Sequence, residues 1–229
     1  MTKQKILIIE DEKNLATSLR IIFEAEGFDI KVCETGTEGL QHLKNYDLLI
    51  LDLMLPDMNG LEILKLIRKT DQKYPIIIVS SKSEEEDLIL GLSSGADDYL
   101  TKPFLVRELV LKIKRIFERK ALYENVVKDI KQVNIAEFKI DFDKLIAETS
   151  EGEIKLTSQE ASLLLFLTQN KNRIISRQEL LEKVWGSSSE IETRTIDNFI
   201  VRFRKYFEKD SKHPTHFITK RGVGYSFID

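Results

Sequence analysis

The sequence predicts an α/β domain built on a five-stranded parallel sheet, followed by a smaller α+β domain. Two observations support this division. In the first half of the chain, short apolar runs alternate with amphipathic segments, which is the pattern of a parallel sheet covered by helices on both faces. After residue 132 the pattern changes to short strands, then helices and a final hairpin, and a length of 229 residues suits two domains better than one.

Each element of the first domain follows from a local pattern. The expected strands are the apolar runs 5–9, 28–33, 47–51, 75–79 and 97–101. The expected helices lie between them, at 13–26, 36–44, 60–70, 83–94 and 104–118; in the first, apolar residues recur at three- and four-residue spacing. Gly27 precedes the second strand and Pro75 opens the fourth, where breakers are expected.

The second domain is expected at 133–229, after a first domain at 1–119 and a linker at 120–132. The linker contains no glycine or proline, so it can extend the preceding helix. Thr157 and Glu160 predict a capping box at the start of a helix. The other elements expected are short strands within 133–156, helices from about 176 and over 191–208, and a closing hairpin over 217–228. Three helices closed by a hairpin are the plan of a winged helix-turn-helix domain.

Composition and charge limit the classes of protein. Hydrophobic content of 42% and charged content of 32% are ordinary for a soluble globular protein. The chain contains no apolar stretch long enough to span a bilayer, and we expect no signal peptide. The single cysteine, Cys33, cannot form an internal disulfide and is expected to be a small packing residue in a cytoplasmic protein. Residues 194–229 carry 8 basic and 4 acidic residues, a modest excess that a nucleic-acid surface would show.

Polar residues follow three of the expected strands. Glu10 and Asp11 follow the first strand, Asp52 follows the third and Lys102 follows the fifth. Parallel strands bring these residues to one edge of the sheet, where sites in open α/β sheets form. Crowded carboxylates repel unless a hard divalent cation binds them, and oxygen ligands favour Mg²⁺. With a lysine to attract an anion, the pattern predicts a phosphoryl-transfer site whose acceptor is the protein itself.

Four motifs make the first domain resemble the receiver domain of OmpR/PhoB-type two-component response regulators. They lie at 8–11, 51–60, 78–82 and 95–104. The resemblance implies a flavodoxin-like (βα)5 fold in which Asp52 accepts a phosphoryl group from a sensor histidine kinase. It also implies a role for Lys102 in neutralising the phosphoryl oxygens and a cis peptide bond before Pro103. Mg²⁺ would be bound by Asp11, Asp52 and the backbone carbonyl of Met54, with Glu10 acting through water.

The same resemblance implies a switch. Ser80 would form a hydrogen bond with the bound phosphoryl group, and Tyr99 would turn inward as Ser80 moves. Dimerisation on phosphorylation would use Asp97, Asp98, Glu108 and Lys112. The sequence departs from the family here, because Leu88 stands where a basic residue commonly pairs with Glu108.

The second domain resembles the DNA-binding domain of the same family over 192–205 and 219–225. On a helical wheel, one face of the first segment is apolar and the opposite face carries cations and an amide, as expected for a helix in a major groove. Arg221 at the hairpin tip suits a minor groove. The implied DNA contacts are Arg177, Trp185, Arg194, Thr195, Asn198, Val201, Arg202, Arg204, Lys205, Thr219, Arg221 and Tyr225. Val201 replaces an arginine often found there and could meet a thymine methyl group.

Together these features predict a bacterial, phosphorylation-controlled transcription factor that dimerises on promoter DNA and contacts RNA polymerase. It would assist its own phosphorylation and dephosphorylation without being an enzyme. One alternative is a phosphatase with an aspartyl nucleophile, of the haloacid-dehalogenase type, although Met54 stands where such enzymes have a second aspartate. The others are a DNA-binding regulator of this fold that ignores phosphorylation, and a C-terminal domain that binds protein.

Overall fold

The computed structural model describes residues 3–185 and 193–229. The chain forms two compact units, residues 1–117 and 118–229.

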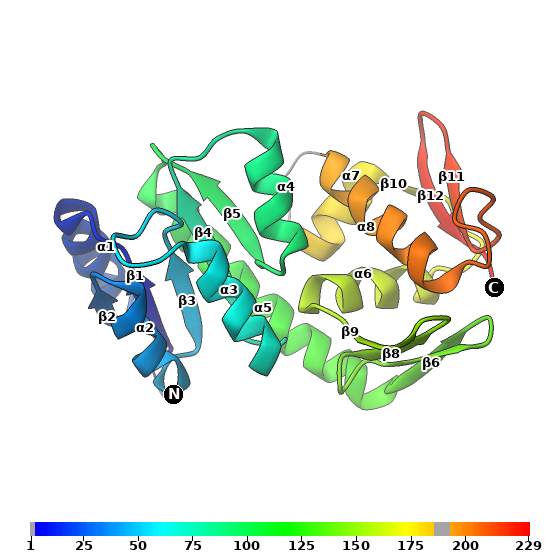
Figure 1. The fold of residues 1–229 in the computed structure, drawn as a ribbon, viewed down its shortest axis with the longest axis horizontal. Coiled ribbons are helices and arrows are strands. Elements are labelled where there is room, and N and C mark those ends of the chain that lie inside the picture. Colours follow the sequence, from blue (N-terminus) through cyan, green and yellow to red (C-terminus); the bar gives the residue numbers. More distant parts are fainter. Residues whose placement is uncertain (1–2, 186–192) are drawn as a thin grey trace. The chain divides into compact units, whose positions relative to one another are not determined.

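The first unit contains a five-stranded parallel sheet in the order β2-β1-β3-β4-β5 (Figure 1). The strands are β1 (Lys5–Ile9), β2 (Asp29–Cys33), β3 (Leu48–Leu51), β4 (Ile76–Ser80) and β5 (Asp98–Thr101). All five lie where the apolar runs predicted them. Strand order reverses between β1 and β3, so the carboxyl ends of these central strands frame the crevice where ligands of open α/β sheets bind.

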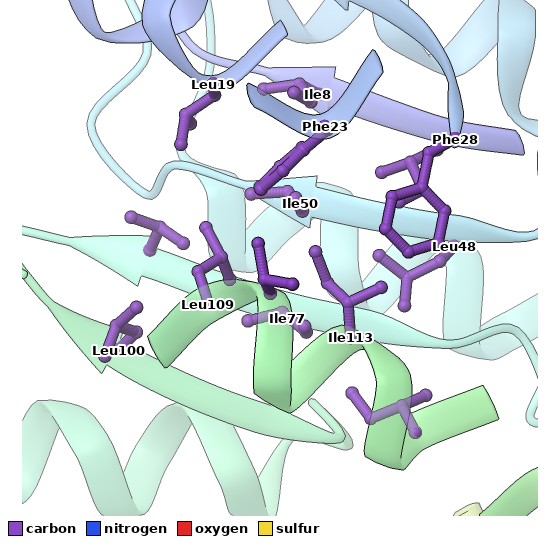
Figure 2. Packing of buried hydrophobic residues seen from close by; sticks show 14 residues of the cluster. Ile8, Leu19, Phe23, Phe28, Leu48, Ile50, Ile77, Leu100, Leu109 and Ile113 are labelled. Carbon is purple, nitrogen blue, oxygen red and sulfur yellow. The ribbon is translucent and has the colours of Figure 1, made fainter. Parts of the chain in front are cut away.

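Helices cover both faces of this sheet. They are α1 (Lys13–Ala25), α2 (Gly36–His42) with the 3₁₀ turn η1 (Leu43–Asn45), α3 (Gly60–Thr70), α4 (Glu85–Ser93) and α5 (Val106–Asp129). Figure 2 shows Phe23 of α1 and Ile113 of α5 packed over Ile50 and Ile77 of the sheet. On the opposite face, helix glycines allow close approach: a Cβ on Gly39 would lie 2.1 Å from the side chain of Ile9.

A buried arginine ties α3 to the loops around β4 and β5. Arg68 Nε donates to the carbonyl of Gly95 at 2.8 Å, and Nη1 donates to the carbonyls of Asp71 and Tyr74 at 3.1 and 2.7 Å. Nη2 lies 3.1 Å from Asp97, whose carboxylate also accepts the N–H of Ile76 at 2.9 Å. One guanidinium therefore satisfies the carbonyls of two loops and neutralises a buried acid.

The second unit begins inside α5. The segment expected as a linker is helical through Asp129, and residues from Glu118 onward belong to the second unit. Tyr123 Oη donates to the carbonyl of Phe142 at 3.0 Å, Arg119 Nη1 donates to that of Val184 at 2.7 Å, and Val127 is buried. These contacts stabilise the helical conformation beyond the first unit.

The remaining elements form the second unit. An antiparallel sheet contains β6 (Gln132–Ile135), β7 (Phe138–Asp141), β8 (Ile146–Thr149) and β9 (Gly152–Lys155). Next come α6 (Ser158–Gln169), β10 (Ile175–Ser176), α7 (Arg177–Leu180), the π-helical turn η2 (Leu181–Trp185) and α8 (Thr193–Phe207). The hairpin of β11 (Phe217–Lys220) and β12 (Gly224–Phe227) pairs with β10 in the order β10-β12-β11. The capping box predicted for α6 is present, with Thr157 and Glu160 as its two members.

Within the described residues, no helix is long and apolar enough to cross a membrane.

Candidate functional site

Three carboxylates meet at the carboxyl edge of the parallel sheet. Glu10, Asp11 and Asp52 each offer an oxygen that lies within 4.8 Å of the others. Ile9 and Leu51 are paired in register, so the residues that follow β1 and β3 leave the sheet side by side. Glu10 and Asp52 are buried, whereas Asp11 is exposed. The cluster consists of oxygen donors, which fits a hard divalent cation such as Mg²⁺.

Lys102 connects two of these carboxylates. Its Nζ lies 2.6 Å from Asp52 Oδ2 and 2.8 Å from both carboxylate oxygens of Glu10. Burial lowers the pKa of Lys102, but its hydrogen bonds to Asp52 and Glu10 raise the pKa above its ordinary value overall. Burial is the largest cause that raises the pKa of Glu10 to about 7; the hydrogen bond from Lys102 opposes this effect and the charge of Asp52 adds to it. The Lys102–Pro103 peptide bond is cis, as expected.

The turn after β3 fixes the orientation of Asp52. Its Oδ1 accepts the backbone N–H of Met54 at 2.9 Å, while Oδ2 faces Lys102. Gly60 allows this turn to close, because a Cβ there would lie 2.3 Å from the carbonyl oxygen of Asp52. Both carboxylate oxygens of Asp52 are therefore held by donors in the free protein.

Ser80 lies on β4, and Tyr99 lies on the adjacent strand β5, where it pairs with Ile78 two residues before Ser80. Ser80 is fully buried, and its Oγ accepts the N–H of Lys82 at 3.3 Å. Tyr99 is 1% exposed and donates from Oη to the carbonyl of Lys82 at 2.9 Å. Gly91 of α4 leaves room for the ring, since a Cβ there would lie 3.0 Å from it. Tyr99 thus occupies an inward position here, and its predicted movement with Ser80 stays a prediction.

A second group of potential metal ligands lies on β2 and α2. Cys33, Glu38 and His42 offer ligand atoms within 4.8 Å of one another. Burial of Cys33, followed by the nearby charge of Glu38, raises the thiol pKa to about 12. A thiol that stays protonated at neutral pH is a poor metal ligand. This agrees with Cys33 as a packing residue.

In the second unit, α8 has the two faces that the helical wheel predicted. Its buried residues are Ile196, Phe199, Ile200, Phe203 and Phe207. Val201 is 61% exposed, Lys205 is exposed, and Asn198 is half-buried. The side chains of Arg194 and Thr195 lie outside the part of the chain described.

Several of the expected DNA contacts bind other residues within the unit. Arg202 Nη2 lies 2.9 Å from Glu160 Oε1, so this arginine is directed toward α6 and not straight into solvent. Arg204 donates from Nε to the carbonyl of Phe217 at 2.9 Å and from Nη2 to Thr219 Oγ1 at 2.7 Å. The ring of Trp185 is buried, with its centre 5.4 Å from that of Phe199.

Arg177 and Tyr225 meet a residue that sequence reasoning did not identify, Asp197. Arg177 Nε lies 2.9 Å and Tyr225 Oη 2.5 Å from the same oxygen of Asp197. The partners are 20 and 28 residues from Asp197 in the sequence, so no local pattern reveals the group.

The hairpin tip is exposed at Arg221, Gly222 and Val223, and Gly222 has a φ of +73°. At Gly224 a Cβ would lie 1.9 Å from the carbonyl oxygen of Ile175, so only glycine allows β12 to pair this closely with β10.

The residues expected at a dimer interface form ion pairs inside the first unit. Lys112 Nζ lies 3.0 Å from Asp98 and 4.0 Å from Glu108, and both Asp98 and Lys112 are buried. Asp97 binds Arg68. Their role in dimerisation stays a prediction.

Comparison with known proteins identifies both domains. Residues 6–114 match the response regulator receiver domain, and residues 151–227 match the C-terminal domain of transcriptional regulatory proteins. The DNA-binding response regulator MtrA of Mycobacterium tuberculosis H37Rv is 37% identical over 97% of this chain and 96% of its own length. The response regulator ArlR of Staphylococcus aureus Mu50 is 41% identical over 96% of this chain and 98% of its own length.

Solved structures of related proteins align over nearly the whole chain. The response regulator DrrB, an OmpR/PhoB homologue from Thermotoga maritima, aligns over the whole of both chains with 30% identity and a TM-score of 0.53. A mutant of RitR aligns over 98% of both chains with 29% identity and a TM-score of 0.74.

A parallel α/β domain with an acidic pocket, followed by a winged-helix domain, defines a DNA-binding response regulator. With the matches above, this chain belongs to the OmpR/PhoB family of two-component response regulators. Its relatives are regulators rather than enzymes in the usual sense.

Proposed function

We propose that this response regulator accepts a phosphoryl group on Asp52 from a sensor histidine kinase and, as a dimer, binds promoter DNA. The observation that supports the acceptor most strongly is the buried Asp52 carboxylate, fixed by Met54 N–H and 2.6 Å from the Lys102 ammonium. A cytoplasmic location in a bacterium and a contact with RNA polymerase belong to the same proposal.

Each residue of the pocket would have a distinct role in phosphoryl transfer. An Asp52 oxygen attacks the phosphorus atom, the bond from phosphorus to the kinase imidazole breaks, and an aspartyl phosphate forms. Lys102, already between Asp52 and Glu10, neutralises charge on the transferred oxygens. Ser80 Oγ would donate a hydrogen bond to one of them. Asp11, Asp52 and the Met54 carbonyl would hold Mg²⁺, with Glu10 acting through water, and the ion would supply further charge neutralisation.

The signal would pass through Ser80 and Tyr99. When Ser80 turns toward a phosphoryl oxygen, its hydrogen bond with Lys82 N–H breaks and the β4–α4 loop must adjust. The Tyr99 hydroxyl holds the carbonyl of the same Lys82, so the two residues act on one loop. This adjustment would favour the dimer, and two winged helices joined in this way bind DNA more tightly than one.

DNA binding would use the exposed face of α8 and the hairpin tip. Of the expected DNA contacts whose side chains are described, Val201, Lys205 and Arg221 are exposed there. Arg202, Arg204, Thr219 and Trp185 would instead support the shape of the surface.

Labelling with a small phosphodonor tests the acceptor. We expect the full chain to form an acid-stable, base-labile adduct with acetyl phosphate and Mg²⁺, and to bind a duplex selected from random sequences more tightly afterwards. Asp52→Asn should lose both the adduct and the gain in binding. Asp29→Asn, which removes an exposed carboxylate on β2, should keep both.

Two results would contradict the proposal. An adduct that forms equally on Asp52→Asn would place the acceptor elsewhere. Many turnovers of the phosphodonor per chain, with no lasting adduct and no effect on DNA binding, would support the phosphatase alternative.

A further inference from the structure

Asp197 joins α7, α8 and β12 at one point. Its Oδ1 accepts the Nε–H of Arg177 at 2.9 Å and the Oη–H of Tyr225 at 2.5 Å. Arg177 Nη2 donates to Tyr225 Oη at 3.1 Å, and its guanidinium carbon lies 4.8 Å from the centre of the tyrosine ring. Two donors from different elements therefore converge on a single anionic oxygen.

The Asp197 carboxylate stands on the accessible side of α8. Its side chain is 42% exposed and lies one helical turn before Val201, which is 61% exposed. A carboxylate on a face that meets DNA would repel phosphates, because like charges at short range disfavour each other. Here Arg177 neutralises Asp197. The Arg177–Asp197 ion pair therefore decides how this part of α8 interacts with DNA.

The two donors suit a phosphate oxygen as well as they suit a carboxylate oxygen. A guanidinium with a neighbouring hydroxyl is a common contact to the DNA backbone. The hydrogen bond to Asp197 is the largest cause that raises the pKa of Arg177. Burial, and then Asp197, raises the pKa of Tyr225 to about 12. Both groups keep their protons near neutral pH and remain donors.

We propose that Asp197 is an internal competitor for the DNA backbone, whose carboxylate occupies the donors of Arg177 and Tyr225 until a DNA phosphate displaces it. This inference rests on the DNA-binding function proposed above. A phosphate that takes the Nε–H of Arg177 or the Oη–H of Tyr225 must displace Asp197 from that donor. The pair therefore lowers the affinity for duplex of any sequence and makes that affinity less sensitive to salt.

Asp197→Asn in the full chain tests the competition, because the amide has the same shape without the charge. Fluorescence anisotropy with a short duplex of mixed sequence, at a series of KCl concentrations, gives the affinity and its salt dependence. We expect about three- to fivefold tighter binding at low salt, the amount a partly exposed ion pair contributes. The slope of log K against log salt should steepen by about one, as for one more phosphate contact.

The same substitution in an Arg177→Ala variant distinguishes displacement of Asp197 from general repulsion between Asp197 and DNA. The gain from Asp197→Asn should vanish there, and Asp210→Asn, which removes an exposed acid elsewhere, should not change the slope. A gain that persists in Arg177→Ala would overturn the proposal in favour of general repulsion. Weaker binding by a fully folded Asp197→Asn would overturn it too, since Asp197 would then position Arg177 for DNA.

A measurement on the unmodified protein covers the case in which the variant does not fold. The Arg177 Nε–H resonance should shift when duplex is added, and an unchanged resonance at saturation would contradict displacement. Failure of the proposed function looks different: the unmodified protein would then not bind duplex at all.

Discussion

At the scale of single residues, several partners share the largest buried charges of the first unit. Arg68 shows this most clearly, because four hydrogen bonds, one of them to the carboxylate of Asp97, surround a side chain that is 6% exposed. Burial lowers the pKa of Arg68, and the charge of Asp97 opposes that effect. Removing one member of such a group leaves the other charge without compensation.

Arg68→Ala should therefore destabilise the first unit by about 3–5 kcal/mol, because the buried Asp97 loses its countercharge and the loop carbonyls lose the guanidinium donors. Urea unfolding followed by hydrogen exchange, read on the peptides of β4 and β5, measures the change. Arg20→Ala, at an exposed position on α1, should shift the free energy of unfolding by no more than about 0.5 kcal/mol. Equal effects of the two changes would show that the Arg68 cluster contributes little.

At the scale of elements, apolar periodicity was enough to predict the five strands and the helices between them. The acidic pocket was also predictable, because Glu10, Asp52 and Lys102 each follow a strand and parallel strands end at one edge. The ion pair of Arg202 with Glu160 was not predictable, since a helical wheel gives the angle of a residue on α8 but not its neighbours on α6. The segment after Ser176 was expected to be an ordinary helix, yet it changes to a π-helical turn at Leu181.

The connection between α8 and β11 depends on one carboxylate at the end of the helix. Glu208 accepts the backbone N–H groups of Thr215, His216 and Phe217 at 2.9, 2.8 and 2.8 Å. Burial raises the pKa of Glu208, but these hydrogen bonds lower it more, so the pKa in the folded protein lies below its ordinary value of 4.5. Its contribution to stability is therefore present above pH 4.5 and is lost as the pH falls through the folded-state pKa.

Glu208→Gln should lower the free energy of unfolding of the second unit by about 1–3 kcal/mol at pH 7, because an amide has one accepting oxygen for the three backbone N–H donors and the Thr215 hydroxyl. The difference from the unmodified protein should shrink as the solution becomes more acidic. Fluorescence of Trp185, the single tryptophan of the chain, follows this unit. Glu151→Gln, at an exposed turn, is the control, and a difference that grows at low pH would refute the assigned role.

At the scale of the whole molecule, the division between the two units falls inside α5 rather than after it. The helix runs to Asp129, while the second unit starts at Glu118. Sequence alone placed the second domain at 133, because nothing in the pattern of 119–132 shows which body its side chains contact. The hydroxyl of Tyr123 makes such a contact, because it donates to the carbonyl of Phe142 in the second unit.

A fragment of residues 118–229 should for that reason be more stable than a fragment of residues 130–229. The shorter fragment loses the buried side chain of Val127, which contributes about 1.5–3 kcal/mol. It also loses the hydrogen bonds that Arg119 and Tyr123 donate to Val184 and Phe142, each about 1 kcal/mol. We expect a difference in the free energy of unfolding of about 3 kcal/mol or more, measured by urea titration with Trp185 fluorescence.

Tyr123→Phe in the longer fragment should account for about 1 kcal/mol of this difference. Equal urea midpoints for the two fragments would mean that the last three turns of α5 do not stabilise the second unit, and that this unit begins where the sequence pattern suggested.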